Sequence, residues 1–208
     1  MIPQVALDGL FIAIGYLSGS LPMGVLVARL TGARDPRTVG SGRTGGTNAL
    51  RAMGARRAAL VATLDVLKGF VPVAAASLVG ASDLGVALTG VAAVVGAWAS
   101  VWLNFHGGRG VATGIGAALF IQPLAIPIGL PVFLLTIFLT RWVSLGSLLT
   151  TVAGIVIIGV FVWLGWNPWP HLLFALLGTA VVWFAHRDNI GRLLRGEERR
   201  FDPFARGD

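Results

Sequence analysis

The sequence predicts an all-α integral membrane protein with about seven transmembrane helices in a single domain, residues 1–208. Of the 208 residues, 55% are hydrophobic and only 12% are charged, and the mean hydropathy is +0.81. A soluble chain of this size needs more charge to cover its surface. The apolar runs show no period-two alternation, so we expect helices and not a closed barrel to satisfy the backbone in lipid.

The first apolar segment runs from about Val5 to Leu30. No basic region precedes it, and the first basic residue of the chain is Arg29, so we expect an uncleaved span with its N-terminus outside. Pro22 predicts a kink within it. The following segment, 31–57, carries six arginines and one acid, Asp35. By the positive-inside rule this loop is cytoplasmic.

Two further spans are predicted at about 58–79 and 86–103. The loop between them contains Ser82 and Asp83 but no Lys or Arg, so it should face outward. After the second of these spans comes a polar segment, Asn104-Phe105-His106-Gly107-Gly108-Arg109-Gly110, whose basic residue places it on the cytoplasmic side.

The apolar stretch 111–139 must begin and end on the same side of the membrane, because Arg141 also reads as cytoplasmic. A single span is therefore disfavoured. We expect a helical hairpin of two short crossings, or a re-entrant pair, with a break near Gln122 and Pro123. Pro127 and Pro131 make the second limb irregular.

The last two spans are predicted at about 145–164 and 171–185, joined by an uncharged loop in which Trp166 and Trp169 read as interfacial anchors. The tail is basic, so the C-terminus is expected in the cytoplasm; its arginines are Arg187, Arg192, Arg195, Arg199, Arg200 and Arg206. The total is five clear spans plus a short helical hairpin.

The most informative polar stretch is 40–51, GSGRTGGTNALR, in which five of twelve residues are glycine. Glycines let backbone N–H groups approach a ligand closely, and the small hydroxyls and arginines beside them suit an oxyanion such as a phosphate. The alternative is a flexible structural loop. A loop that only connects two helices does not require the combination of Ser41, Thr47, Asn48 and Arg51.

Two other polar clusters are predicted on the same side. In the segment 104–110, bare glycine amides and Arg109 precede a helix that starts near Val111, so they can hold a phosphate, or they form a tight turn with a snorkelling arginine. At the end of the last span, His186 and Asn189 lie three residues apart and so share one helix face. They form either part of a binding site or an ordinary helix C-terminus.

Asp65 and Lys68 lie in the middle of an apolar span, where an ionised group costs about 2.5–3.5 kcal/mol or more. Their spacing of three residues allows a structural ion pair. Alternatively, Lys68 forms the floor of a polar cavity and Asp65 orients it.

Several kinds of chemistry are excluded or disfavoured. The chain has no cysteine and only three histidines, so no metal site and no cofactor is predicted. No histidine is followed five positions later by aspartate, which excludes the HxxxxD pair of many acyl-CoA-dependent acyltransferases. The net charge of +7 is spread over loops between spans, so anionic lipid and phosphorylated substrates, and not nucleic acid, are the expected partners.

Four motifs resemble those of the bacterial membrane-embedded glycerol-3-phosphate acyltransferases that use acyl phosphate as donor, the PlsY type. GSGRTGGTNALRAMG is similar to GSGNxGATNxxRxxG, LDVLKGF to LDxxKGF, NFHGGRGVAT to FKGGKGVAT, and HRDNIGRLLRGEE to HRENIxRLLxGxE. The resemblance implies seven helices and an active site facing the cytoplasm of the bacterial plasma membrane. It also implies transfer of a fatty acyl group to the sn-1 hydroxyl of glycerol 3-phosphate, which gives lysophosphatidic acid and phosphate, with the donor's own phosphate accepting the proton.

By position, the resemblance assigns catalytic roles to Ser41, Arg51, Lys68, Arg109, His186 and Asn189. It assigns substrate and phosphate binding to Gly40, Gly42, Thr47, Asn48, Gly107, Gly108 and Gly110, and supporting roles to Asp65 and His106. The acyl tail would lie between helices, and the protein would act as a monomer without a cofactor.

The chain departs from the family pattern at a few positions: Ala97 stands where the family has a histidine, His106 and Arg109 replace lysines, and Arg43 and Gly46 replace Asn and Ala. The alternative function is a non-catalytic membrane protein that binds or transports a phosphorylated lipid or metabolite.

Overall fold

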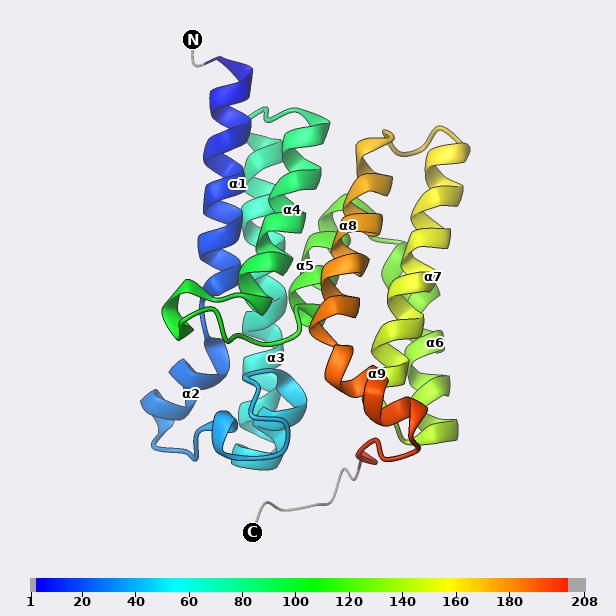
Figure 1. Cartoon of the computed structure of the whole chain (residues 1–208). Coiled ribbons are helices and arrows are strands. Elements are labelled where there is room, and N and C mark those ends of the chain that lie inside the picture. Colours follow the sequence, from blue (N-terminus) through cyan, green and yellow to red (C-terminus); the bar gives the residue numbers. More distant parts are fainter. Residues whose placement is uncertain (1–2, 202–208) are drawn as a thin grey trace.

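The computed structural model describes residues 3–201, and in that range the chain is a bundle of helices without a strand (Figure 1). The ends of the predicted domain 1–208, including Arg206 of the basic tail, lie outside the described residues. The N-terminal end of the described chain lies at one end of the bundle and its C-terminal end at the other.

The first apolar segment is not one kinked helix but two. Helix α1 covers Gln4–Ser20 and α2 covers Met23–Thr31, and their axes differ by 45°. Pro22 lies in the break, as expected for a residue that lacks a backbone N–H. The break exposes the carbonyl of Leu21, which accepts a hydrogen bond from Lys68 Nζ at 3.0 Å.

The polar segment that follows is more helical than the sequence predicts. After a short 3-10 helix η1, Pro36–Thr38, helix α3 extends over Gly46–Leu78 and so begins twelve residues before the predicted span. Its first turns are amphipathic, because Ala49 and Met53 pack with Ala28 of α2 in a small apolar cluster. Gly54, at φ 79°, interrupts the helix after these turns.

The middle of the chain follows the predicted pattern closely. Helix α4 covers Asp83–Trp98 and is capped by Ser82, whose side chain accepts from Gly85 N. The short helix η2, Val101–Leu103, leads to the hairpin of α5, Val111–Ile121, and α6, Ala125–Thr140. The expected break near Gln122 and Pro123 is confirmed.

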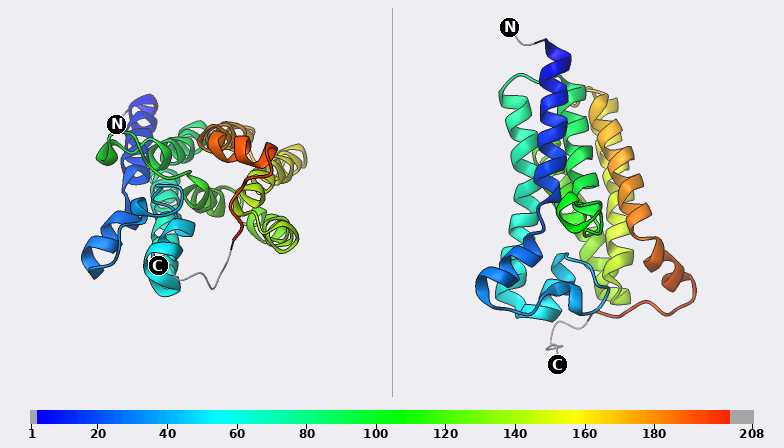
Figure 2. Two further views of the ribbon diagram at one scale, coloured as in Figure 1. Left: turned by 60° about the horizontal axis from the view of Figure 1, so that its bottom comes forward. Right: turned by 60° about the vertical axis from the view of Figure 1, so that its left-hand side comes forward.

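The last part comprises α7, Val143–Trp163, α8, Pro170–Ala185, and a short α9, Arg187–Leu194, that turns away from α8. In the bundle, α1 packs against α4, α3 against α5, α4 against α8, and α6 against α7. Figure 2 shows α5 near the centre, enclosed by these helices. The main apolar core includes Phe11, Val73, Ala117, Ile158 and Phe174.

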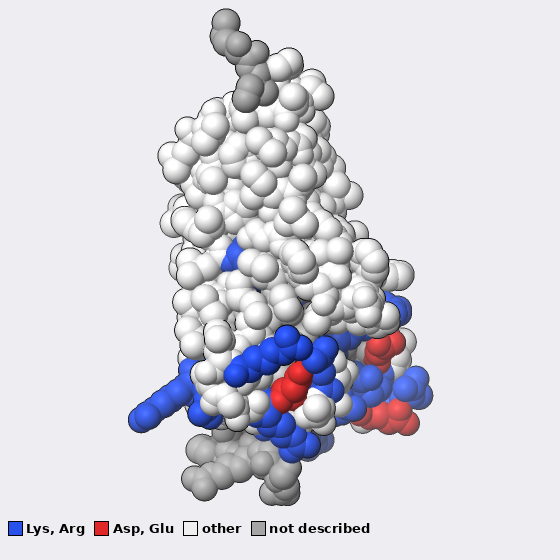
Figure 3. Space-filling model, turned by 90° about the vertical axis from the view of Figure 1, so that its left-hand side faces the viewer, with Lys and Arg blue, Asp and Glu red and all other residues white. Residues whose placement is uncertain are grey.

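Within the described residues, three helical segments are long and apolar enough to cross a membrane: Gly46–Leu78, Asp83–Leu103 and Val143–Trp163. The bent pair α1 and α2 makes a fourth, and α5, α6 and α8 are shorter apolar helices. Charged residues gather at the end of the molecule opposite the N-terminus, on the face shown in Figure 3, and the rest of that face is almost uncharged.

Candidate active site

A polar cavity of about 260 Å³ lies at the charged end of the bundle, between the N-termini of α3 and α5, the start of α7 and the junction of α8 with α9. Most of the predicted site residues line it: Ser41, Thr47, Asn48, Arg51, Asp65, Lys68, Gly108, Arg109, Gly110, His186 and Asn189. The lining contains two acidic side chains, Asp65 and Glu198, against six basic ones: Arg43, Arg51, Lys68, Arg109, Arg192 and Arg199. This excess of positive charge suits an anionic ligand.

Four predicted residues, Gly40, Gly42, Gly107 and His106, are not among the lining residues. His106 is exposed, and its Nδ1 lies 2.6 Å from the carbonyl oxygen of Asn104 in the same turn. The three glycines shape the loops behind the cavity. A side chain on Gly40, for example, would collide with Asn48 and Arg51.

Asn48 is the centre of the glycine-rich loop. It is 3% exposed, and its Nδ2 lies within hydrogen-bond distance of the carbonyl oxygens of Pro36, Val39 and Arg43, at 3.0 to 3.3 Å. Its Oδ1 accepts from Arg51 Nη1 at 3.2 Å. The amide is thus occupied within the protein, so we interpret Asn48 as a positioning residue that folds the loop and orients Arg51.

The glycine amides of the second cluster are not bare, contrary to the expectation from the sequence. Gly107 N donates to the carbonyl of Trp98 at 2.9 Å, and Gly108 N donates to that of Ala97 at 2.7 Å. These bonds fasten the loop to the end of α4. The first turn of α5, from Val111 to Thr113, lines the cavity instead, so the N–H groups available for an anion are those of the helix N-terminus.

Arg109 is a half-buried cation that lines the site, and its Nε atom is buried. Its Nε has no hydrogen-bond partner among the described residues. Burial and the neighbouring Arg43 lower the pKa of Arg109 to about 10, so the guanidinium stays protonated at neutral pH. A buried guanidinium nitrogen without a partner is costly in an empty protein and is well suited to an oxyanion.

Arg43 connects the three polar clusters. Its Nη1 donates to the carbonyl of Gly107 at 3.3 Å, and its Nη2 lies 3.9 Å from the carboxylate of Asp188. The side chain therefore joins the first loop to the second loop and to α9.

His186 follows the last residue of α8 and is 1% exposed. Its Nδ1 lies 2.8 Å from the carbonyl oxygen of Val182, which assigns the proton to Nδ1 and leaves Nε2 as an acceptor. Burial, together with the positive charge of Arg109, lowers the pKa of His186 to about 4. The imidazole is therefore neutral at pH 7 and is a weak base.

Asn189 presents one free atom to the cavity. Its Nδ2 donates to Glu198 Oε1 at 2.7 Å, which fixes the orientation of the amide, and its buried Oδ1 has no partner among the described residues. Glu198 also accepts from Arg192 Nε at 2.9 Å. Sequence reasoning did not assign Glu198 a role, although it stands in the last quoted motif.

Asp65 and Lys68 form the ion pair that their spacing allows, with 2.7 Å between Oδ1 and Nζ. Both are buried and both line the cavity. Lys68 also donates to Leu21 at the break between α1 and α2. The structural interpretation therefore holds, and the pair also forms part of the cavity wall.

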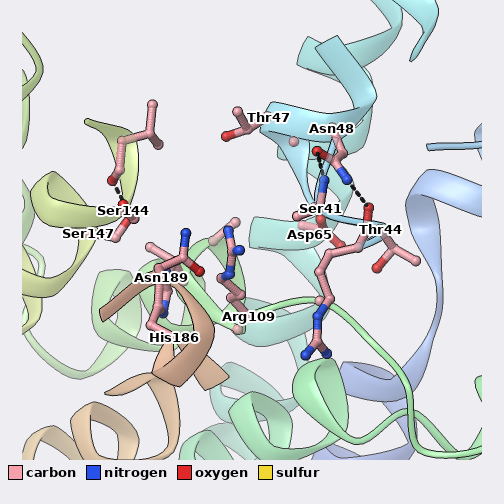
Figure 4. Close-up of a pocket in the computed structure, with 18 of the residues that line it drawn as sticks. Ser41, Thr44, Thr47, Asn48, Asp65, Arg109, Ser144, Ser147, His186 and Asn189 are labelled. Atoms are coloured by element: carbon pink, nitrogen blue, oxygen red, sulfur yellow. Dashed lines mark hydrogen bonds between the residues drawn. The ribbon is translucent and has the colours of Figure 1, made fainter. Parts of the chain in front are cut away.

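Ser144 and Ser147, on the first turns of α7, are site residues that the sequence analysis missed. Figure 4 shows them on the opposite side of the cavity from Thr47, Asn48 and Ser41, facing Asn189. Ser147 donates to the carbonyl of Val143 at 3.0 Å, whereas the hydroxyl of Ser144, which is 4% exposed, has no partner among the described residues. No motif marked them, because a serine in an apolar helix is common.

An apolar groove of about 220 Å³ adjoins the polar cavity. It runs between α5, α6, α7 and α8, and four residues line both spaces: Val111, Ile115, Phe133 and Ser147. The two spaces together fit a ligand with an anionic head and a hydrocarbon tail.

The model of a family described as glycerol-3-phosphate acyltransferase matches residues 9–196. A glycerol-3-phosphate acyltransferase of a Synechococcus strain is 46% identical over 189 residues, covering 89% of each chain. A relative from Dehalococcoides mccartyi, glycerol-3-phosphate acyltransferase 3, is 39% identical over 95% of this chain and 97% of its own.

Two crystal structures of PlsY, an integral membrane glycerol 3-phosphate acyltransferase, have the same fold. Its glycerol 3-phosphate form superposes with a TM-score of 0.85 at 35% identity, covering 94% of this chain and 96% of that one. Its lysophosphatidic acid form superposes with a TM-score of 0.83 at 33% identity, covering 95% and 97%. The chain therefore belongs to the glycerol-3-phosphate acyltransferase family of integral membrane enzymes.

Proposed function

We propose that the protein transfers a fatty acyl group from acyl phosphate to the sn-1 hydroxyl of glycerol 3-phosphate, giving lysophosphatidic acid and inorganic phosphate. The observation that carries this proposal is the continuity of the cationic cavity with the apolar groove through Val111, Ile115, Phe133 and Ser147. An acyl phosphate has an anionic head, which fits the cationic cavity, and a hydrocarbon tail, which fits the adjoining apolar groove. The glycerol 3-phosphate form and the lysophosphatidic acid form of PlsY support this acceptor and this product.

The reaction requires two phosphate groups in one cavity, one on each substrate. Two helix N-termini, those of α3 and α5, meet there, and Arg51 and Arg109 lie beside them. Each N-terminus carries a partial positive charge and N–H groups with no partner inside the helix. These four elements would neutralise both phosphates and hold the acyl carbonyl near the acceptor hydroxyl, which lowers the entropic part of the barrier.

Glycerol 3-phosphate must also be oriented through its hydroxyl groups, because contacts to its phosphate alone do not fix the glycerol. Those hydroxyls need hydrogen-bond acceptors on the protein. His186 Nε2 and Asn189 Oδ1 are both acceptors on the cavity wall. Glycerol 3-phosphate has two hydroxyl groups, so these two atoms match it in number and kind. We assign them to positioning the glycerol so that its sn-1 oxygen faces the acyl carbonyl.

In the chemical step, the sn-1 oxygen attacks the carbonyl carbon of the acyl phosphate, and the bond from that carbon to the phosphate oxygen breaks. The hydroxyl proton moves to the departing phosphate. The pKa of His186 is about 4, so its imidazole is a weak base. The departing phosphate is then the proton acceptor, and the substrate itself completes the proton transfer.

The same proposal includes a location and a topology. The charged end of the bundle, with the cavity, would face the cytoplasm of the bacterial plasma membrane, as the positive-inside rule predicts. The apolar helices, with α1 and α2 as one broken span, would make seven crossings, with the N-terminus outside and the C-terminus inside. One chain supplies the whole cavity lining, so we propose that the monomer is active without a cofactor.

The test is to incubate the purified protein, in detergent or lipid, with palmitoyl phosphate and glycerol 3-phosphate, and to measure phosphate release and lysophosphatidic acid together. We expect equal amounts of both products, only when both substrates are present, and none with palmitoyl-CoA as donor. Folded protein that binds glycerol 3-phosphate but makes no product would contradict the proposal. That result would favour a binding or transport role, with Ala97 as the residue that marks the lost chemistry.

A further inference from the structure

The glycines of the bundle differ in what a side chain at each would meet. At Gly69 and Gly116, a Cβ would collide with the backbone of the facing helix, at Thr113 and Val66 respectively. These glycines allow α3 and α5 to touch along their backbones, as small residues do in membrane helix pairs. Their function is packing.

The glycines of the apolar groove are different. Four of the helices that line it contribute one each: Gly114 from α5, Gly129 from α6, Gly154 from α7 and Gly178 from α8. A Cβ would meet its nearest neighbour at 3.5 Å at Gly114, 3.7 Å at Gly129 and 3.8 Å at Gly178, and would meet nothing within 4 Å at Gly154. These are ordinary contacts or open space, so helix packing does not require glycine at these positions.

The groove has a defined near end and far end. Ser147 lies at the junction with the polar cavity, and Gly154 and Ile158 follow it along the same helix. At 1.5 Å per helical residue, Gly154 lies roughly 10 Å and Ile158 roughly 16 Å from that junction. Ile158 and Phe174 are buried members of the main core, so the far end is closed.

We propose that the four groove glycines, with Gly154 in the middle of the path, determine the length of acyl chain that the enzyme accepts. The inference rests on the proposed function, because the occupant is the tail of the acyl phosphate held in the adjoining cavity. The missing side chains keep the groove open between its junction at Ser147 and its closed end at Ile158 and Phe174. A chain that extends past Gly154 depends on this space, and a chain that ends before it does not.

The experiment compares Gly154→Leu with the natural protein, using octanoyl phosphate and palmitoyl phosphate as donors and glycerol 3-phosphate as acceptor. Because a few methylene groups in a shaped pocket change kcat/KM by about 10-fold or more, we expect at least that loss with palmitoyl phosphate. Turnover of octanoyl phosphate should stay unchanged in the same variant, which also shows that the variant is folded. Gly154→Ala should give a smaller loss in the same direction, and Gly129→Leu should repeat the effect from the facing wall.

Gly159→Leu is the matched control. It lies on the same helix, does not line the groove, and has Leu172 as its nearest neighbour at 3.7 Å. We expect it to treat both donors alike. An equal loss with both donors in Gly154→Leu, or no loss with either, would overturn the proposal. Failure of the proposed function would be recognised separately, because the natural protein would then make no product from either donor.

Discussion

Two buried polar clusters lie at opposite ends of the bundle, and they differ in whether their atoms are paired. Near the end with the N-terminus, Gln122 Nε2 donates to Asn167 Oδ1 at 2.7 Å, and Asn167 Nδ2 donates to the carbonyl of Ile121 at 3.1 Å and lies 2.7 Å from His171 Nδ1. In the cationic cavity, by contrast, Arg109 Nε, Ser144 Oγ and Asn189 Oδ1 are buried without a partner among the described residues.

The difference separates structure from function. A buried polar group without a partner costs about 1–3 kcal/mol, so a cluster with complete pairing stabilises the fold. A cluster with free atoms that converge on one cavity is stable only with a ligand or water between them. The first cluster fastens the turn between α5 and α6 to the loop between α7 and α8, whereas the second leaves polar atoms free, as a ligand site requires.

The largest effect should come from Arg51→Ala. Its guanidinium is oriented by Asn48 and faces the cavity beside the N-terminus of α3. Removal of one preorganised donor of this kind typically lowers turnover by about 10²–10³-fold. We therefore expect loss of lysophosphatidic acid synthesis with an unchanged melting temperature in detergent.

Arg43→Ala is the matched comparison for Arg51→Ala. Arg43 donates to one backbone carbonyl, and its Nη2 lies 3.9 Å from the carboxylate of the exposed Asp188. Contacts of this kind are worth about 1 kcal/mol or less, so its loss of activity should be milder. Equal losses in the two variants would contradict a specific phosphate contact for Arg51.

Asn167→Ala tests the paired cluster. It removes an acceptor from Gln122 and a donor from Ile121 and His171, so we expect the free energy of unfolding to fall by about 1–3 kcal/mol. The melting temperature measures this loss, and KM for glycerol 3-phosphate should not change. A raised KM with an unchanged melting temperature would mean that the two ends of the bundle are functionally coupled.

The fold and much of the candidate site could be predicted from the sequence, because both depend on strong local signals. The hairpin in 111–139 followed from charge placement alone, and the break occurs at Gln122 and Pro123 as expected. The start of α3 could not be predicted, because Gly45 and Gly46 read as loop. The packing of Ala49 and Met53 on α2, which makes those turns helical, is a tertiary contact.

Within the site, the residue types were informative but their hydrogen bonds were not. Gly107 and Gly108 read as free amide donors, and only the fold reveals that the end of α4 uses both. Glu198 and Ser144 were missed for the opposite reason. The tail folds back to bring Glu198 to Asn189, and the hairpin brings α7 to the cavity, so both roles depend on contacts that form only in the folded chain.

Ser144→Ala tests whether an unpaired buried hydroxyl contacts substrate. If it does, KM for one substrate should rise by about 3- to 10-fold, the usual value of one hydrogen bond. Ser147→Ala is the matched control, because that hydroxyl already donates to Val143. A fall in melting temperature with unchanged KM would instead assign Ser144 to the fold.

The smallest effect on activity should come from the titration of His186. Its pKa of about 4 in the folded protein lies below the ordinary value of 6.5, so the unfolded chain binds the proton first as pH falls. Stability should therefore be undiminished above pH 6.5 and should decrease as pH falls from 6.5 to 4. His186→Gln should flatten that decrease in the melting temperature.

The pH dependence of activity, in contrast, should not be set by the titration of His186. If the donor's phosphate accepts the proton, the midpoint of the pH profile of kcat should reflect the titration of that phosphate and not that of the imidazole. That midpoint should be the same in the natural protein and in His186→Gln, although the variant is slower. If the midpoint is present in the natural protein but absent in His186→Gln, His186 is the base. The weak basicity inferred from its burial would then be wrong.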